Sequence, residues 1–419
     1  TTFLTMAYII FANPSILADA GMDKQALIAT TCIVSAIATI LTGLLGRAPI
    51  AMAPGMGLNA FFAYTLVLTD EVLWQTALGV VFLSGLFFLV LTFLGLRRKL
   101  VEAIPPSLIS AISVGIGLFI TFIGLQNLGL IEASQATLVQ ASKLTPTALI
   151  GLAGLIVMLF LEMRKVKGSL LIGIVFSTVL AATLGYIEKP AQWISLNVDI
   201  RAVAFQLDIL GALKWSLFAS IFTLMFIDMF DSVGTLVACC HQAQMVDENN
   251  NIRGLDRLLG IDALATMIGA ALGTSTTTSY IESAAGIEEG GRTGLTSVVT
   301  GLMFLLALLF VPVVGVVPGY ATAPALIMVG LFMMREVTKI DFARMDEAFP
   351  AFIIMVMIAL SYSISTGLAF GFVSFVVIKV VAGKLADIKP AMWVIALLSL
   401  AFLSLERLPA LFQWLHNLV

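Results

Sequence analysis

Long stretches without a charged residue restrict the fold of this sequence more than any other feature. Uncharged runs cover 25–46, 48–69, 72–96 and 103–131, and the run 293–334 is longer still. A helix needs about 20 mostly apolar residues to cross a bilayer, so most runs hold one span and the longest holds two. The pattern predicts an all-α polytopic membrane protein with about 14 transmembrane segments.

The composition excludes several functional classes. Only 11% of the 419 residues are charged, and the mean hydropathy is +1.07. Soluble domains carry about 25% charged residues, so a soluble enzyme, a nucleic-acid binder and a disordered chain are all excluded. The three cysteines, Cys32, Cys239 and Cys240, have neither disulfide nor metal-ligand spacing. We therefore expect no metal, no cofactor and no nucleic-acid partner.

The basic residues predict an orientation. Lysine and arginine gather in alternate loops, with clusters at 97–99 and 164–167 on the same predicted side. Cytoplasmic loops carry the excess of basic residues in membrane proteins. We expect a multi-pass protein of the cell (inner) membrane with its N-terminus in the cytoplasm.

Two spans do not read as continuous helices. The third span, 47–64, contains Pro49 and Pro54 followed by two glycines, and the tenth, 273–286, begins with a run of hydroxyl residues. Extended backbone at membrane depth is tolerated only inside protein or beside a cavity. Each segment is predicted to be a short strand followed by a half-helix, beginning near Gly55 and near Tyr280. Broken spans at matching positions predict two inverted repeats of seven segments, as in secondary transporters.

Three acids fall inside predicted spans. They are Asp228, Asp231 and Glu282, and a charged group there costs about 2.5–3.5 kcal/mol on insertion scales, which usually indicates a function. Asp228 and Asp231 are three residues apart and share a helix face. Because three nearby carboxylates would repel one another, at least one is expected to bind a proton. A structural role, capping a half-helix or bonding to Ser232 or Thr235, is the alternative.

Five segments resemble one transporter family. They look like the nucleobase–ascorbate transporter superfamily and, within it, the AzgA-like purine permeases. The resemblance rests on TFLTMAYI at 2–9, APGMGLNAFFAY at 53–64, FDSVGTL at 230–236, TTTSYIESAAGI at 276–287 and GGRTGLT at 290–296.

The resemblance implies a division into domains. Residues 1–100 and 209–318 would form a core domain that carries substrate. Residues 101–208 and 319–389 would form a gate domain, which is also a homodimer surface in relatives. Residues 390–419 would form a C-terminal apolar or interfacial segment.

The resemblance also implies a substrate site and a proton site. Proton coupling would rest on Asp228 or Asp231, because 232–235 lacks the histidine of other branches. Phe61, Phe62 and Tyr280 are candidates for stacking on the base. The candidate substrate-binding residues are Asn59, Asp228, Asp231, Thr278, Ile281, Glu282 and Gly57.

These observations predict a function together with its alternatives. The expected protein is a secondary active transporter that imports adenine, guanine or hypoxanthine by proton symport, and it is not an enzyme. Motion of the core domain against the gate domain would carry the purine across the bilayer. The alternatives are a sulfate-type anion carrier of the same architecture, a sodium-coupled nucleobase carrier and a channel. Carboxylates at the site argue against an anion carrier, and polarity confined to mid-membrane argues against a channel.

Overall fold

The computed structural model describes residues 1–95, 104–188, 190, 192–195, 199–246, 252 and 254–416, so the basic cluster at 97–99 lies outside them. Within these residues, nine helical segments are long and apolar enough to cross a membrane. Three shorter apolar helices cover Met56–Thr69, Ser169–Thr183 and Pro390–Ser404. The chain is therefore a multi-pass, mostly helical membrane protein, as predicted.

The elements follow one another as short and long helices with four short strands. The helices up to the first long loop are α1 (Thr2–Met6), α2 (Ile9–Asp19), α3 (Lys24–Leu44), α4 (Met56–Ala60), the π-helix η1 (Phe61–Thr69), α5 (Trp74–Phe93), α7 (Pro106–Asn127), α8 (Pro146–Met163) and α9 (Ser169–Thr183). The remaining helices are α10 (Ile209–Ala212), η2 (Trp215–Leu217), α11 (Phe218–Gln242), α12 (Leu255–Leu272), α13 (Ser283–Glu288), α14 (Gly294–Ala307), η3 (Leu308–Phe310), α15 (Val311–Gly315), α16 (Gly319–Met334), η4 (Arg335–Lys339), α17 (Met345–Ser361), α18 (Ile364–Val381), η5 (Leu385–Asp387) and α19 (Pro390–His416). The strands are β1 (Met52–Pro54), β2 (Ile131–Ser134), β3 (Leu138–Ala141) and β4 (Thr277–Ser279).

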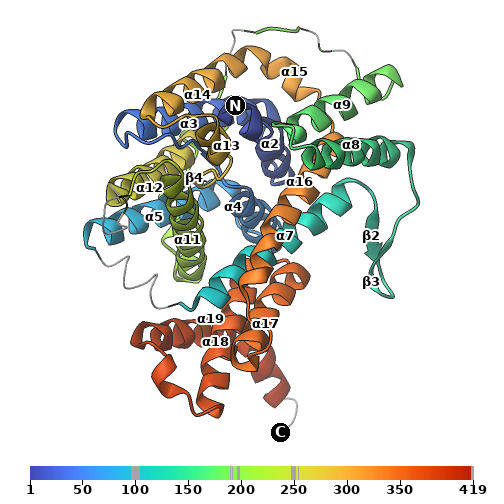
Figure 1. The fold of residues 1–419 in the computed structure, drawn as a ribbon. Helices are drawn as coiled ribbons and strands as arrows, with labels where there is room; N and C mark the ends of the chain where they lie inside the picture. The colour runs from blue at the N-terminus through green and yellow to red at the C-terminus, as the bar shows by residue number, and fades with distance from the viewer. Residues whose placement is uncertain are drawn as a thin grey trace. The chain divides into compact units, whose positions relative to one another are not determined.

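The chain forms two compact units. One contains Thr1–Phe93 with Ile120–Val329, and the other contains Leu94–Phe119 with Gly330–Val419. In the first unit α3 and α14 run side by side (Figure 1). A Cβ atom added to Gly43 or Gly294 would overlap the carbonyl oxygen of the other glycine, so the two backbones approach closely because neither residue has a side chain.

Both broken spans have the predicted form. β1 pairs antiparallel with β4, with Met52 opposite Ser279, so the two strands form one ribbon. α4 begins one residue after Gly55, and α13 begins at Ser283. The expectation of a short strand followed by a half-helix is therefore confirmed in both spans. The π-helical turn η1 that continues α4 carried no signal that we recognised in the sequence.

Two boundaries differ from the expectation. The uncharged run 348–378 predicts two spans joined near 365–367, but α17 ends at Ser361 and α18 begins at Ile364. Tyr362 adopts a left-handed backbone, and the Ser363 hydroxyl accepts a hydrogen bond from the Thr366 N–H, so this pair makes the turn. The helix α12 begins at Leu255, well before the uncharged run 263–281, so the start of that run does not mark the start of the helix. The hairpin β2–β3 was not predicted.

Candidate substrate and proton site

The ribbon of β1 and β4 organises the site. Beyond the paired strands, the Gly55 N–H donates to the Thr276 carbonyl at 2.9 Å, and the Tyr280 N–H donates to the Ala51 carbonyl at 3.0 Å. A Cβ atom at Gly55 would lie 2.8 Å from the Thr278 methyl group, so glycine is required for this approach. The two broken spans are therefore joined by backbone hydrogen bonds inside the first unit.

Glu282 directly precedes α13 and is half-buried. The Tyr8 hydroxyl donates to Glu282 Oε1 at 2.7 Å. Tyr8 is 2% exposed and lies at the break between α1 and α2. This tyrosine was not predicted as a site residue, although it lies in one of the segments that carried the resemblance. Its hydroxyl fixes the direction of the one acid that follows the β4 strand.

Asp231 on α11 is exposed. The Thr278 hydroxyl lies 3.4 Å from Asp231 Oδ2 and 2.8 Å from the Ser232 hydroxyl. Glu282 is close enough to repel Asp231 electrostatically. Asp231 on α11 and Glu282 before α13 therefore lie close to each other, and Asp231 lies beside the Thr278 hydroxyl of β4. Ile281, which is 52% exposed, and the half-buried Gly57 are also accessible.

Other predicted residues are enclosed. Asp228 is 1% exposed, and the Thr266 hydroxyl lies 3.2 Å from its Oδ2 atom. Asn59 is fully buried, and its side-chain oxygen accepts a hydrogen bond from the Ser275 hydroxyl. Thr278 is 2% exposed. In this structure these three side chains lie behind the accessible surface.

The aromatic candidates for stacking are also buried. Phe61 and Phe62 are 0% exposed, and Tyr280 is 5% exposed with its hydroxyl donating to the Pro54 carbonyl at 2.5 Å. The rings are therefore packed within the protein. Of the site residues named from the sequence, Ile281 offers the most accessible apolar side chain.

Sequence reasoning missed a further acid at this site, and this acid is buried. Asp262 lies on α12, is 0% exposed, and has the Ser279 hydroxyl 3.4 Å from its Oδ1 atom. The count of uncharged runs did not reveal it, because Asp262 directly precedes the uncharged run 263–281. The buried Leu258, Leu259 and Ile261 beside it are the signal that could have extended the helix toward its start.

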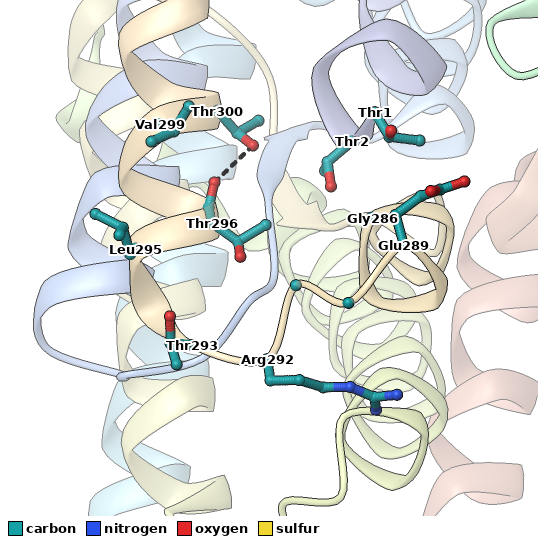
Figure 2. A pocket seen from close by; sticks show the side chains of 12 residues that line it. Thr1, Thr2, Gly286, Glu289, Arg292, Thr293, Leu295, Thr296, Val299 and Thr300 are labelled. Atoms are coloured by element: carbon teal, nitrogen blue, oxygen red, sulfur yellow. Dashed lines mark hydrogen bonds between the residues drawn. The ribbon is translucent and has the colours of Figure 1, made fainter.

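A separate pocket of about 420 Å³ lies where α1, α13 and α14 meet. Figure 2 shows Thr1 and Thr2 on one side, and Thr296, Val299 and Thr300 on the other. None of the predicted site residues lines it. We therefore do not place the substrate there. Within the described ranges, no group of three or more His, Cys, Asp or Glu residues is arranged to hold a metal ion.

Comparison with known proteins identifies the family. The model of the permease family matches residues 1–370. A putative permease of Methanocaldococcus jannaschii is 46% identical, over 95% of this chain and 92% of that protein. The adenine permease AdeP of Escherichia coli is 40% identical, over 95% and 89%. The guanine/hypoxanthine permease PbuG of Bacillus subtilis is 41% identical, over 94% and 92%.

Solved structures show the same fold at low identity. The transmembrane domain of the cyanobacterial bicarbonate transporter BicA has a TM-score of 0.66 at 16% identity, covering 87% of this chain and 95% of that one. Murine Slc26a9, an anion transporter in the inward-facing state, has a TM-score of 0.64 at 12% identity, covering 91% and 68%. Similarity at this level shows the fold alone. With the family match and the relatives above, the chain belongs to the permease family, the nucleobase–ascorbate transporter group that its motifs predicted, and it is a membrane permease and not an enzyme.

Proposed function

We propose that this protein is a secondary active transporter that imports purine nucleobases, namely adenine, guanine or hypoxanthine, by proton symport. The observation that carries the proposal is the pair of acids Glu282 and Asp231 at the end of the β1–β4 ribbon, where one is half-buried and the other exposed. The names of AdeP and PbuG, which align over nearly the whole chain, support the same substrate class.

The chemistry of a purine suits this site. The base is flat and uncharged, and its edge carries N–H donors and ring-nitrogen acceptors. A carboxylate can accept two N–H bonds in parallel, so Glu282 is proposed as the main ligand of that edge. Asp231, Gly57 and Ile281 would complete the accessible surface. Asn59 and Thr278 are enclosed here, so they would affect the substrate indirectly, by holding the strand in position.

The proposed transport cycle moves a core domain against a gate domain. Both broken spans and the four acids Asp228, Asp231, Asp262 and Glu282 belong to the segments assigned to the core, 1–100 and 209–318. The antiparallel pairing of β1 with β4 is what an inverted repeat would produce at its centre, and it supports that arrangement. A homodimer through the gate domain, and an N-terminus on the cytoplasmic side of the inner membrane, complete the proposal.

Competitive uptake tests the proposal. Purified protein in liposomes should take up labelled hypoxanthine, and unlabelled guanine or adenine should compete whereas sulfate and uracil should not. Uptake should follow an inward proton gradient and stop when a protonophore is added. Sulfate uptake would favour the anion carrier, and uptake driven by sodium at constant pH would favour sodium coupling. Liposomes without protein are the control for leakage.

A further inference from the structure

We propose that Asp262 and Asp228 form one buried proton-binding site, in which the two carboxyl groups share a single proton, and that Asp231 supplies this site with protons. The inference rests on the proposed function, because it gives the coupled proton a place. Asp262 is the new element, since the sequence motifs pointed to Asp228 and Asp231 alone.

The two aspartates face each other across neighbouring helices. Thr266, one turn after Asp262 on α12, places its hydroxyl 3.2 Å from Asp228 Oδ2. Ser232, one turn after Asp228 on α11, lies beside Asp262. A hydroxyl from the helix of each acid therefore lies beside the other acid. The carboxyl groups of Asp228 and Asp262 are close enough to interact electrostatically.

Too few hydrogen-bond donors surround the pair to stabilise two ionised carboxylates. Asp228 Oδ1 and Asp262 Oδ2 are both out of contact with solvent, and within the part of the chain that the structure describes neither has a hydrogen-bond partner. The Thr266 hydroxyl also lies 2.9 Å from the Thr277 carbonyl, and it has only one proton to give. A proton shared by the two carboxyl groups satisfies both orphaned oxygens and halves the buried negative charge.

Among the residues that the structure describes, no basic group lies against the pair in place of that proton. α4, α5, η2 and β4, which pack against α11 or α12, carry no charged residue. Three basic residues lie at the ends of the packed elements, and they are Lys24 at the first position of α3, Lys214 directly before η2 and Arg257 near the start of α12. The other titratable groups on or beside these elements are acids, thiols, phenols and one imidazole, namely Asp231, Glu282, Glu288, Asp256, Cys32, Cys239, Cys240, Tyr8, Tyr280 and His241.

A chain of hydroxyl groups connects the buried pair to the accessible surface. It runs from Asp231 to Thr278 at 3.4 Å and then to Ser232 at 2.8 Å, and Ser232 lies beside Asp262. A proton on Asp231 passes to the Thr278 oxygen while that hydroxyl gives its own proton to Ser232, and Ser232 gives its proton to Asp262. One proton moves and no electrons are transferred. Rotation of the two hydroxyl groups then resets the chain.

Infrared spectroscopy tests the shared proton directly. Wild-type protein at neutral pH and without substrate should show the C=O band of a protonated carboxyl group. Asp262→Asn should lose this band, because the amide donates to Asp228 and replaces the proton. The mirror variant Asp228→Asn should lose it as well, which keeps the test decisive if one variant fails to fold. Asp256→Asn, at the exposed start of the same helix, should keep the band.

Transport measurements separate this inference from the proposed function. Asp262→Asn should bind purine within about threefold of wild type and exchange labelled for unlabelled purine, but it should no longer accumulate purine when a pH gradient is applied. A band that persists in both Asn variants, or full accumulation by Asp262→Asn, would overturn the shared site while leaving purine transport standing. The shared site would also be overturned if the wild type lacks the C=O band and accumulates purine when driven by sodium. If no purine is taken up, the proposed function fails and the infrared result still decides the inference.

Discussion

Replacement of Glu282 by glutamine is the most direct perturbation of the proposed substrate site. The carboxylate is half-buried and oriented by the Tyr8 hydroxyl at 2.7 Å. A hydrogen bond to a charged group contributes about 1.5–3 kcal/mol. Glu282→Gln turns one of the two acceptor oxygens into a donor, which opposes an N–H of the substrate edge and weakens the other bond. A loss of about 3 kcal/mol corresponds to about a hundredfold weaker binding.

Isothermal titration of purified protein with adenine, guanine and hypoxanthine measures this change. Glu288→Gln is the matched control, because Glu288 is exposed at the other end of α13 and should keep wild-type affinity. Wild-type affinity in a folded Glu282→Gln protein would refute the assignment of the main ligand. A similar loss in both variants would show that α13 had been disturbed as a whole.

A companion variant tests how Glu282 is held. Tyr8→Phe removes the hydroxyl donor and keeps the buried ring. If the tyrosine only orients Glu282, its loss should weaken binding by about tenfold, less than the loss of the acid itself. The double variant should then bind no more weakly than Glu282→Gln. Strictly additive losses in the titration would show that Tyr8 acts elsewhere.

Two further predictions concern charges away from the substrate site. Lys167 lies 2.7 Å from Glu289 and joins the α8–α9 loop to the end of α13, so Lys167→Gln should speed amide hydrogen exchange in α13 while Lys165→Gln should not. Because the hydrogen bond from Lys167 lowers the pKa of the Glu289 carboxyl, the pair stays ionised even below the usual glutamate pKa, and the difference in exchange should persist from neutral pH down to about pH 4. Asp346→Asn should destabilise the protein by about 3 kcal/mol in thermal or denaturant unfolding, because Lys379 is 3% exposed and donates to Asp346 at 2.7 Å.

The spans and the two breaks were predictable because the bilayer imposes strong local rules. Uncharged runs mark the apolar helices, and the prolines before Gly55 and the hydroxyl run after Gly273 both disfavour helix over short distances. These signals need no tertiary information. The helix boundaries were less predictable. The turn at Tyr362 and Ser363 depends on a left-handed residue and a serine cap, and neither stands out within an apolar run.

The site was predictable in part, and the part that was missed has a physical cause. An acid inside an apolar run, such as Glu282, is visible in the sequence. Asp262 was hidden because it lies close to other charges in the sequence, and only the packing of α12 against α11 shows that it is buried. The different exposures of Asp228 and Asp231 were also beyond the sequence. Residues three apart share a helix face, but the neighbouring helix decides which of them it covers.

The ribbon of β1 and β4 restricts the motions that could open such a site first to one side of the membrane and then to the other. If the two halves of the protein rocked apart at their broken spans, the hydrogen bonds from Gly55 to Thr276 and from Tyr280 to Ala51 would have to break, together with those of the paired strands. Each bond contributes about 1 kcal/mol, and buried backbone groups left without partners would cost more. Motion of both broken spans together as one body keeps every one of these bonds. The joined ribbon therefore supports a moving core that holds its substrate and its acids in fixed geometry.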